Sequence, residues 1–316
     1  MIRPVQKDLY AVIGNPVGHS LSPIMMNAVF EALQIPAVYL ALQVDDPTED
    51  LAMLARLGIR GLSVTIPHKE VVYRLASRVD EASRAMGAAN TLRLDQSKWE
   101  GCNTDWIGAI TALHQEMGRL KTSRDAETSV ANHANPPGKV KVAPRHAPHG
   151  AERIFEGKRA LVIGAGGVAR AVAYGLRREG VAVTVSNRGV DRGEALAKIF
   201  DADFIPLSEL PDTSIGTAFD IIVQCTSVGL MAGEDFTLIP AALFRPESVV
   251  MDTVYRPLWT PFLRKAKAAG CIVVTGVEML LHQGVAQLKW WFGDVIQADA
   301  VLPIMRRALM GLLEDG

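Results

Sequence analysis

The sequence is poor in the features that mark secreted, membrane-spanning and nucleic-acid-binding proteins. Its 316 residues include only three cysteines, Cys102, Cys225 and Cys271, which form neither a C-x-x-C pair nor an even disulfide set. No stretch reaches the roughly 18 consecutive apolar residues that a membrane-spanning helix needs. The formal net charge is −1, which gives no electrostatic reason to expect nucleic acid or an anionic membrane as a partner. The expected partners are therefore small molecules.

Neither a secretion signal nor a metal site is predicted. The N-terminal stretch MIRPVQKDLYAVIG contains no apolar run followed by a cleavage site. Together with the scarcity of cysteine, this favours a reducing, cytoplasmic location in which the thiols stay free. Three histidines, His133, His146 and His149, lie in one irregular stretch, but their spacing matches no pattern of metal ligands.

Short apolar segments alternate with helix-like segments in the first third of the chain. The first helix-like segment begins with Ser22, expected to be its N-cap, and Pro23, expected at the first helical position. Such alternation predicts an α/β fold with a largely parallel sheet. The predicted strands are 9–14, 37–44, 61–67 and 88–94, and the predicted helices are 22–35, 48–57, one starting at 69, and 104–117.

The length suggests two domains, at about 100–200 residues each. Residues 119–157 show little periodicity and are rich in proline, glycine, alanine and charge, which indicates a mobile linker or a surface insertion. A second α/β unit follows this segment. Its predicted strands are 160–163, 219–224, 248–252 and 271–274, with a helix near 259–269 and helices throughout 276–313.

The stretch VIGAGGVARA carries a G-x-G-x-x-A motif directly after an apolar strand and at the start of an amphipathic helix. Gly164 would allow the tight turn, Gly166 would let the backbone approach a pyrophosphate, and Ala169 would let the helix pack closely on the strand. The N–H groups of the helix N-terminus would then face the phosphates. This context predicts a dinucleotide site rather than a glycine-rich turn alone.

The end of the next strand indicates which dinucleotide is bound. NAD-preferring folds usually place an acidic residue there, whereas this sequence reads VSNRGVDRG, with Asn187, Arg188 and Arg192. Two guanidinium groups suit the 2′-phosphate of NADP, and helical spacing is expected to turn Asp191 away. We therefore predict NADP rather than NAD. The alternative is a pair of solvated arginines at the start of a surface helix.

Polar side chains follow the predicted strands of the first unit. In an open parallel sheet, ligands bind beyond the carboxyl ends of the strands, so these side chains are expected to converge on one crevice that suits a small polyhydroxylated acid. Each also has a simpler explanation as a helix cap, a strand or turn residue, a helix N-terminus or a solvated charge. The residues are Ser20, Ser22, Thr65, Lys69, Asn90 and Asp105.

The sequence resembles those of the shikimate dehydrogenase family. The resemblance covers nearly the whole chain except 119–157, and its motifs occur in the family's order. They are VIGNPVGHSLSP (12–23), GLSVTIPHK (61–69), GAANTL (87–92), GCNTDWIGA (101–109), VIGAGGVARA (162–171), VSNR (185–188), CTSVGL (225–230), DTVYRPLWTPFL (252–263) and GVEMLLHQG (276–284).

The resemblance implies reversible, NADPH-dependent reduction of 3-dehydroshikimate to shikimate, a step toward the aromatic amino acids. It also implies two α/β domains around a cleft, with C-terminal helices that return to the first domain. The predicted division is a substrate-binding catalytic domain (1–118), the insertion (119–157), an NADP-binding Rossmann domain (158–275) and the C-terminal helices (276–316). A homodimer is a candidate assembly.

The resemblance also implies roles for individual residues. Ser20, Ser22 and Tyr255 would hold the substrate carboxylate. The ring hydroxyls and the reacting oxygen would be bound by Thr65, Lys69, Asn90, Asp105 and Gln283, among which Lys69 and Asp105 form the catalytic pair. The implied cofactor-binding residues are Gly164, Ala165, Gly166, Gly167, Val168, Asn187, Arg188, Arg192, Thr226 and Gly276, with Gly167 at the pyrophosphate and Gly276 near the nicotinamide.

The chemistry explains why such a pair is needed. Hydride addition to a ketone leaves an alkoxide, which must receive a proton as it forms. An ammonium group can supply that proton and can stabilise the developing charge. Whether Lys69 or Asp105 moves the proton is left open by the sequence. His68 is expected to be structural, because it adjoins Lys69 and would point elsewhere in an extended chain.

Four features depart from the common family pattern. Ser63 stands where asparagine is frequent, Gly189 replaces a threonine, Gln224 and Cys225 replace an Asn-Ala pair, and the 119–157 segment is unusually long. Two other functions are weighed against shikimate dehydrogenase. One is a quinate or dual-specificity dehydrogenase. The other is a non-catalytic ligand sensor, which would be expected to lack Lys69 or Asp105.

Overall fold

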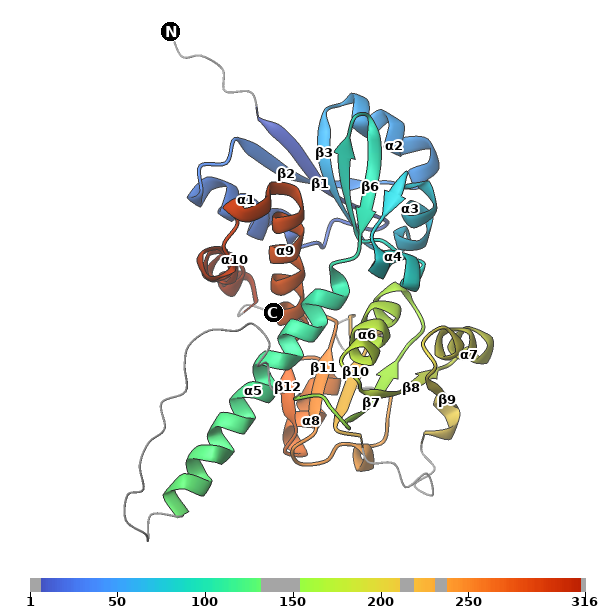
Figure 1. Cartoon of the computed structure of the whole chain (residues 1–316), viewed down its shortest axis with the longest axis vertical. Coiled ribbons are helices and arrows are strands. Elements are labelled where there is room, and N and C mark those ends of the chain that lie inside the picture. Colours follow the sequence, from blue (N-terminus) through green and yellow to red (C-terminus); the bar gives the residue numbers. More distant parts are fainter. Residues whose placement is uncertain (1–6, 132–153, 211–218, 231–237, 314–316) are drawn as a thin grey trace.

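The computed structural model describes residues 7–131, 154–210, 219–230 and 238–313, with the backbone alone for 120–131 and 313. It contains two six-stranded sheets, one in the upper and one in the lower half of Figure 1. The upper sheet and the helices around it form the first unit, and the lower sheet and its helices form the second unit. The predicted two-unit α/β fold is therefore confirmed.

The first sheet is mixed rather than largely parallel. Its order is β2-β1-β3-β5-β6-β4, and β5 runs antiparallel to both β3 and β6. The hairpin between β5 and β6 turns at Gln96 and Ser97, both with positive φ, and lacks the Asn-Gly pair that usually marks such a turn. The strands are β1 (Asp8–Gly14), β2 (Ala37–Gln43), β3 (Ile59–Val64), β4 (Arg78–Val79), β5 (Thr91–Asp95) and β6 (Lys98–Cys102).

The helices of the first unit start at residues close to those predicted. One detail differs, because Ser22 lies inside α1 and no side chain caps that helix; Pro23 does occupy its first turn. The expected N-cap role of Ser22 was therefore wrong, and its hydroxyl instead forms a hydrogen bond with the Tyr39 phenol. The helices are α1 (Ser22–Ala32), α2 (Pro47–Arg56), α3 (Lys69–Leu75) and α4 (Glu81–Met86), the last of which was not predicted.

The second sheet is parallel throughout and doubly wound. Read from one edge its order is β9-β8-β7-β10-β11-β12, so the strand order reverses between β7 and β10, where folds of this kind bind dinucleotides. The strands are β7 (Arg159–Ile163), β8 (Ala182–Asn187), β9 (Asp203–Pro206), β10 (Ile221–Gln224), β11 (Val249–Asp252) and β12 (Ile272–Val274), and the helices are α6 (Gly167–Arg178), α7 (Val190–Ile199) and α8 (Pro261–Ala268).

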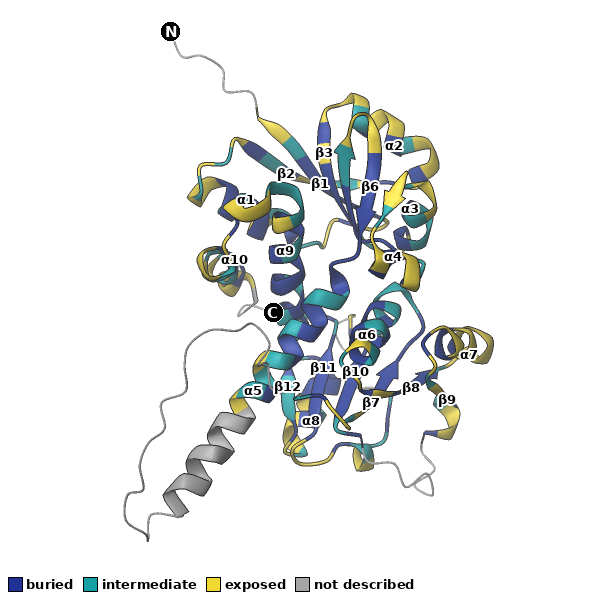
Figure 2. Cartoon of the chain, in the orientation of Figure 1, coloured by how far each residue is buried: buried dark blue, intermediate teal, exposed yellow. Residues whose placement is uncertain are grey.

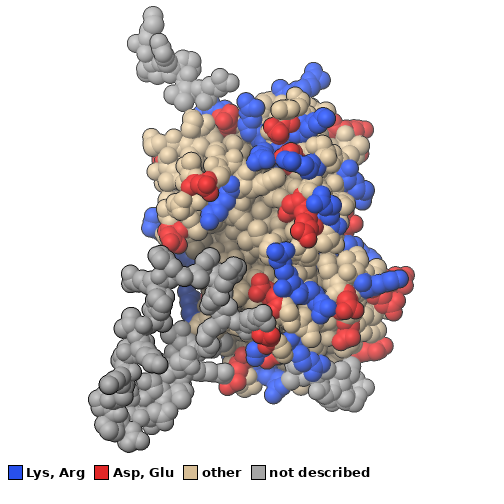
Figure 3. Space-filling model, viewed as in Figure 1, with Lys and Arg blue, Asp and Glu red and all other residues tan. Residues whose placement is uncertain are grey.

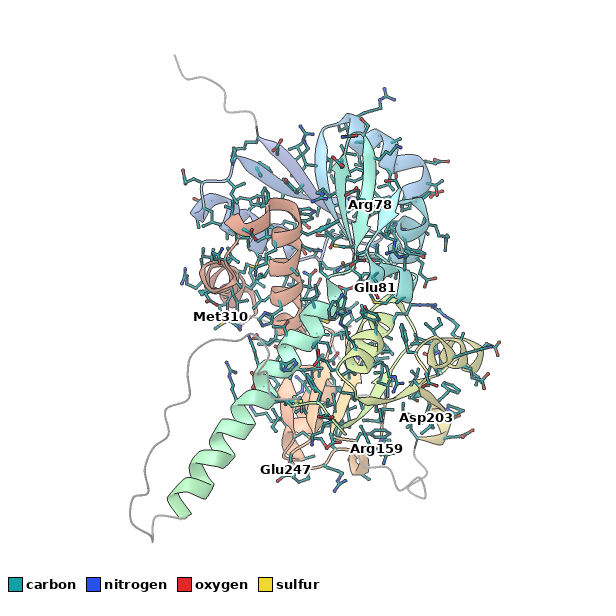
Figure 4. All side chains as sticks on the ribbon, in the orientation of Figure 1. Arg78, Glu81, Arg159, Asp203, Glu247 and Met310 are labelled. Atoms are coloured by element: carbon teal, nitrogen blue, oxygen red, sulfur yellow. The ribbon has the colours of Figure 1, made fainter. Side chains whose placement is uncertain are left out.

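The carboxyl ends of the second sheet face the first unit. Arg159 begins β7 and Glu247 precedes β11, and both lie at the end of the lower sheet that is remote from the upper one (Figure 4). The opposite ends of these parallel strands therefore point toward the space between the units. Figure 2 shows strands β7, β10 and β11 buried almost throughout, as their continuous apolar sequence requires.

Helix α5 (Asp105–Ala131) is longer than the predicted helix 104–117. It continues through residues 119–131, which had been assigned to the insertion. That stretch has weak amphipathicity but contains good helix formers and no proline, so propensity can extend the helix without a clear periodic signal. The residues 132–153 of the expected insertion lie outside the described part of the chain. Ile110 and Leu113 of α5 pack into the core of the second unit beside Val162.

The C-terminal helices α9 (Gly276–Phe292) and α10 (Ala298–Leu313) return to the first unit, as predicted. Leu281 and Leu288 of α9 share a core with Tyr10 of β1 and Met25 of α1. The indole of Trp291 also donates a hydrogen bond to the Leu92 carbonyl of β5, at 3.0 Å. Short 3₁₀ turns complete the fold at Leu207–Glu209, Ala241–Leu243 and Gly293–Val295.

The charged side chains on the surface are of mixed sign. On the face drawn in Figure 3, lysine and arginine side chains are interspersed with aspartate and glutamate. Among the described residues, no helix combines the length and apolarity that crossing a bilayer requires. Within the same residues, no group of three or more histidine, cysteine or acidic side chains is placed to hold a metal ion.

An ion pair between Glu278 and Arg306 joins α9 to α10. Arg306 Nη2 donates to Glu278 Oε2 at 2.7 Å, and Nη1 donates to the other oxygen. Burial alone would raise the pKa of the Glu278 carboxyl, but the hydrogen bonds and charge of Arg306 bring it below its usual range. A lowered pKa means that this pair stabilises the fold above the ordinary pKa of glutamate, and that the stabilisation is lost as the pH falls through the lowered value.

We expect Glu278→Gln to lower the free energy of unfolding by about 1–2 kcal/mol at pH 7, because it leaves a half-buried guanidinium without its counter-charge. The difference from wild type should shrink as the pH falls through the lowered pKa of Glu278, because the wild-type carboxyl then also becomes neutral. Urea unfolding followed by circular dichroism over a series of pH values measures this. Glu194→Gln on exposed α7 is the control, and a pH-independent difference for Glu278→Gln would contradict the ion-pair explanation.

Candidate active site

A cavity of about 290 Å³ lies between the two units, at the carboxyl ends of their strands. Its lining includes residues that follow β1 and β3 in the first unit, residues that follow β10 and β11 in the second, and one face of α9. All eight predicted substrate-binding residues are in this lining: Ser20, Ser22, Thr65, Lys69, Asn90, Asp105, Tyr255 and Gln283. The six residues of the strand-end argument therefore do converge on one crevice, although Asn90 lies at the amino end of β5, which reaches the crevice because it runs antiparallel to β3.

Lys69 and Asp105 form a buried ion pair in the cavity wall. Lys69 Nζ lies 2.6 Å from Asp105 Oδ2, and the two residues are 8% and 5% exposed. Each is the first residue of a helix, Lys69 of α3 and Asp105 of α5. A carboxylate at a helix N-terminus is stabilised by the helix dipole, so α5 offsets part of the cost of burying Asp105.

Asn90 orients the carboxylate of this pair. Asn90 Nδ2 donates to Asp105 Oδ1 at 2.7 Å, while Asn90 Oδ1 accepts from the backbone N–H of Thr104, also at 2.7 Å. The backbone N–H of Asp105 donates to Asn103 Oδ1 at 3.0 Å. Asn90 is therefore held from two sides and is more than a turn residue, which was its simpler explanation.

A cluster of hydroxyl groups forms another part of the same cavity wall. Ser20 Oγ accepts a hydrogen bond from the backbone N–H of Ser22 at 3.3 Å. Burial raises the pKa of the Tyr255 phenol, against an opposing hydrogen bond with Ser20. The phenol therefore stays protonated and can donate to an anionic group.

His68 does not contribute to the cavity. Its Nε2 lies 2.6 Å from the Val44 carbonyl oxygen, and the side chain is buried on the other side of the β3–α3 connection. An extended chain was expected here from the sequence, but His68 has helical dihedrals and immediately precedes α3. The helical turn, rather than strand alternation, directs His68 and Lys69 to different sides.

A second cavity, of about 350 Å³, lies at the point where the order of the second sheet reverses. Gly164 has a φ of +117°, and a Cβ there would lie 3.2 Å from the Cys225 carbonyl oxygen, so the turn requires glycine. No side chain caps α6, which leaves its first N–H groups to face a phosphate. The predicted residues in this lining are Gly164, Ala165, Gly166, Asn187, Arg188, Arg192 and Thr226.

The lining of the second cavity suits a 2′-phosphate. Arg188 and Arg192 are exposed, and neither has an ion-pair partner in the described part of the chain. No acidic side chain is among the described lining residues, and Asp191 is not part of the lining, as expected. The geometry and charge therefore fit a phosphorylated dinucleotide.

The two cavities adjoin each other. Cys225, Thr226 and Ser227 line both, so a ligand that fills the second cavity can extend into the first. Val168 and Gly276, predicted to bind cofactor, line the first cavity. Gly167 is in neither lining; a Cβ there would lie 3.2 Å from Lys69 Cδ. Besides offering its N–H to a phosphate, Gly167 therefore leaves room for the stem of Lys69.

The buried carboxyl of Asp252, at the end of β11, was not singled out from the sequence. Asp252 accepts hydrogen bonds from Thr260 Oγ1 at 2.6 Å, from the Val254 N–H at 2.9 Å and from Gln224 Nε2 at 3.3 Å. Burial raises the pKa of the Asp252 carboxyl to about 7, although these hydrogen bonds oppose the rise. The residue ties together the two loops that carry Thr226 and Tyr255.

Three cavity residues were also missed as site candidates. His19 gave no signal beyond its place in a motif, and Ser63 was noted only as a departure from the family pattern. Gln287 follows Gln283 by one helical turn, so helical spacing would have placed it on the same face of α9.

Family models match three parts of the chain. Residues 12–92 match "Shikimate dehydrogenase substrate binding domain", residues 149–232 match "Shikimate / quinate 5-dehydrogenase", and residues 276–310 match "Shikimate 5'-dehydrogenase C-terminal domain". A curated shikimate dehydrogenase (NADP(+)) from Syntrophobacter fumaroxidans is 50% identical over 313 residues, which cover 99% of this chain and 97% of that protein.

Solved structures agree with the sequence comparisons. The shikimate dehydrogenase of Aquifex aeolicus superposes with a TM-score of 0.76 at 30% identity, covering 98% of this chain and 100% of that one. The shikimate 5-dehydrogenase of Thermus thermophilus, solved with NADP(H) and shikimate, has a TM-score of 0.74 at 32% identity, covering 96% of this chain and 100% of that one.

The second cavity generates a prediction about anion binding. We expect Arg188→Ala to weaken binding of 2′,5′-ADP by about 10-fold, because it removes a charge-assisted contact to the 2′-phosphate, and to leave 5′-AMP nearly unaffected. Isothermal titration calorimetry with both nucleotides measures the difference. Lys198→Ala, at the far end of α7, is the control for a general loss of positive charge. Equal weakening of both nucleotides would contradict a 2′-phosphate contact.

Proposed function

The chain belongs to the shikimate dehydrogenase family, and we propose that Lys69 and Asp105 form the catalytic pair of its reaction. The enzyme is an NADP-dependent oxidoreductase that reversibly reduces 3-dehydroshikimate to shikimate. This reaction belongs to the shikimate pathway of aromatic amino acid biosynthesis. The observation that supports the proposed pair most directly is the buried 2.6 Å contact between Lys69 and Asp105 in the wall of the first cavity.

We propose that Lys69 moves the proton and that Asp105 holds the lysine in place. Asp105 already accepts from Asn90 at Oδ1 and from Lys69 at Oδ2. Lys69 has three N–H groups, and only the one directed to Asp105 is used by a described hydrogen bond. The lysine can therefore reach the oxygen of a bound ring while its partner stays fixed.

In the reducing direction, bound NADPH supplies the hydride. Lys69 would donate a proton to the oxygen as negative charge develops on it, and the remaining ammonium N–H groups would orient that oxygen beforehand. In the oxidising direction the neutral amine formed in this way would take the hydroxyl proton back. Asp105 would hold the Lys69 amino group in place in both steps, whether it is charged or neutral.

The other cavity residues are proposed to hold the ring. Ser20, Ser22 and Tyr255 would hold the substrate carboxylate through their hydroxyl groups, and all three line the first cavity. Thr65, Asn90 and Gln283 would bind ring hydroxyls.

The cofactor residues are proposed from the second cavity and its junction with the first. Gly164, Ala165, Gly166 and the N–H groups of Gly167 and Val168 would face the pyrophosphate. The adenosine 2′-phosphate would be held by Asn187, Arg188 and Arg192. Thr226 and Gly276 lie in the lining of the first cavity, where they would contact the nicotinamide.

Shikimate is favoured over quinate by the carboxylate end of the cavity. Quinate carries an additional ring hydroxyl beside its carboxylate, and the small Ser20 and Ser22 side chains suit the simpler ring. A non-catalytic sensor is disfavoured because Lys69 and Asp105 are both present and paired. The dual-specificity alternative remains the main competitor to be tested.

We also propose domain boundaries, a cellular location and an assembly state. We place the domain divisions at 1–118, 119–157, 158–275 and 276–316, although α5 crosses the first of them. A cytoplasmic location is consistent with the three cysteines being free thiols. A homodimer is consistent with β2 lying at an edge of the first sheet with Leu40 exposed, and analytical ultracentrifugation would test it.

The proposed specificity is tested by supplying shikimate or quinate with NADP or NAD and following nicotinamide reduction by absorbance. We expect the highest kcat/KM for shikimate with NADP, since the cavities suit the simpler acid and the phosphorylated cofactor. Turnover with none of the four pairs would overturn the enzyme assignment. Faster turnover of quinate with NAD would overturn the proposed specificity.

The proposed proton transfer is tested at Lys69. We expect Lys69→Ala to lower kcat by roughly 10²–10⁴-fold, the usual contribution of a positioned acid, with a much smaller change in the Kd for shikimate. Lys69→Arg keeps the charge and hydrogen-bond donors but cannot release a proton near neutral pH, so its kcat should also stay low. Lys198→Ala is the surface control. Recovery of most activity in Lys69→Arg would show that the lysine only orients the substrate.

A further inference from the structure

A buried chain of hydrogen bonds leads from the first sheet through α9 toward the catalytic pair. The phenol of Tyr39 on β2 donates to Ser63 Oγ on β3, at 2.5 Å. Ser63 Oγ donates to Gln287 Oε1 at 2.8 Å, and Gln287 Nε2 donates to Thr91 Oγ1 at 3.1 Å. The amide of Gln287 thus bridges two neighbouring strands of the sheet, β3 and β5.

The chain continues from Thr91 to Asp105. Thr91 Oγ1 donates to Asn90 Oδ1 at 3.0 Å, and Asn90 Nδ2 donates to Asp105 Oδ1 at 2.7 Å. None of the residues from Tyr39 to Asp105 in this chain is more than 5% exposed. Breaking a link therefore leaves polar groups without water to replace the lost partner.

The direction of every hydrogen bond is set by the end at Asp105. A carboxylate only accepts, and the backbone N–H of Thr104 only donates, so Asn90 must present its N–H group to Asp105 and its oxygen to Thr104. With that oxygen accepting, Thr91 must donate to it. Thr91 in turn can accept from Gln287, which settles the orientation of the Gln287 amide.

The other end of the chain agrees with this direction. Ser63 uses its only proton toward Gln287 Oε1, so it must accept from Tyr39. Burial raises the pKa of the Tyr39 phenol, against opposing hydrogen bonds with Ser63 and Ser22, so Tyr39 keeps the proton that it donates. All donors consequently point along the chain toward the catalytic carboxylate, an arrangement in which each bond strengthens the next.

Gln287 occupies the middle of this chain and faces the cavity, yet both ends of its amide are already bonded. We propose that Gln287 is a positioning residue for the dehydrogenase reaction, acting through Thr91 and Asn90 to hold the Asp105 carboxylate against Lys69. It does not bind the ring itself, in contrast to Gln283 one turn earlier on α9.

This role predicts a pattern that neither substrate binding nor simple structural support would give. A residue that binds the ring would raise KM when removed. A residue that only stabilises the fold would lower Tm without changing kcat. A residue that positions Asp105 through Thr91 should lower kcat at nearly constant KM, and its effect should vanish once Thr91 has lost its hydroxyl.

The test compares Gln287→Leu, Thr91→Val and the double variant in the shikimate and NADP assay, with Tm measured for each. We expect each single variant to lower kcat by about 10-fold with KM for shikimate within about twofold of wild type. The double variant should be slowed by about 10-fold as well, rather than the ~100-fold of independent effects. Thr91→Ser, which keeps the hydroxyl, should retain wild-type kcat, and Gln297→Leu on the surface is the control for losing an amide.

Three outcomes would overturn the proposal: kcat of Gln287→Leu within twofold of wild type, a rise in KM without a fall in kcat, or multiplicative effects in the double variant. If Gln287→Leu does not fold, the comparison of Thr91→Val with Thr91→Ser serves as the test. Equal kcat for these two variants would also overturn the proposal. The inference rests on the proposed catalytic pair. The two proposals can fail separately. If kcat of Lys69→Ala stays near wild type, the proposed catalytic pair is wrong. If only kcat of Gln287→Leu stays near wild type, the pair stands and the positioning role is wrong.

Discussion

The ion pair between Lys69 and Asp105 is the interaction on which the rest of the site depends. Burying two charges costs several kcal/mol per ion unless each is well paired, so a buried pair persists only where its surroundings favour both charges. Here Asp105 has the N-terminus of α5, the amide of Asn90 and the Lys69 ammonium as partners. Lys69 keeps donors for a ligand. The pair is therefore stabilised mainly from the carboxylate side, which leaves the lysine available for chemistry.

The larger architecture brings the pair to the cofactor. Helix α5 begins with Asp105 in the first unit and packs its next turns into the core of the second, so the carboxylate is attached to both. The stem of Lys69 passes close to Gly167, the first residue of α6, where the dinucleotide turn leads into its helix. The strand order of the second sheet reverses beside this turn, between β7 and β10. Hydride and proton donors would thus meet where the two units face each other.

Much of this site was accessible from the sequence, for reasons that are local. Short local motifs were enough to predict three features of the site, because each motif permits few backbone geometries. These features are the tight turn at Gly164, the arginines after β8 and the polar residues at strand ends. The hairpin at Gln96 and Ser97 was missed because its turn lacks glycine. Helical spacing could have placed Gln287 on the cavity face of α9, but its role depends on Ser63, 224 residues away in the chain. The role of Asp252 depends on its burial between strand β10 and the loop that follows β11. Helix α5 was predicted too short because its second half lacks a clear apolar face.

The central claim is that Lys69, rather than Asp105, exchanges a proton with the reacting oxygen. A crystal structure of the enzyme with shikimate and NADP bound tests it most directly. We expect Lys69 Nζ to lie about 2.7–3.2 Å from the ring hydroxyl that is oxidised, with Asp105 still bonded to Lys69 and Asn90. A structure in which the Asp105 carboxylate contacts that hydroxyl, while Lys69 lies out of reach, would contradict the claim.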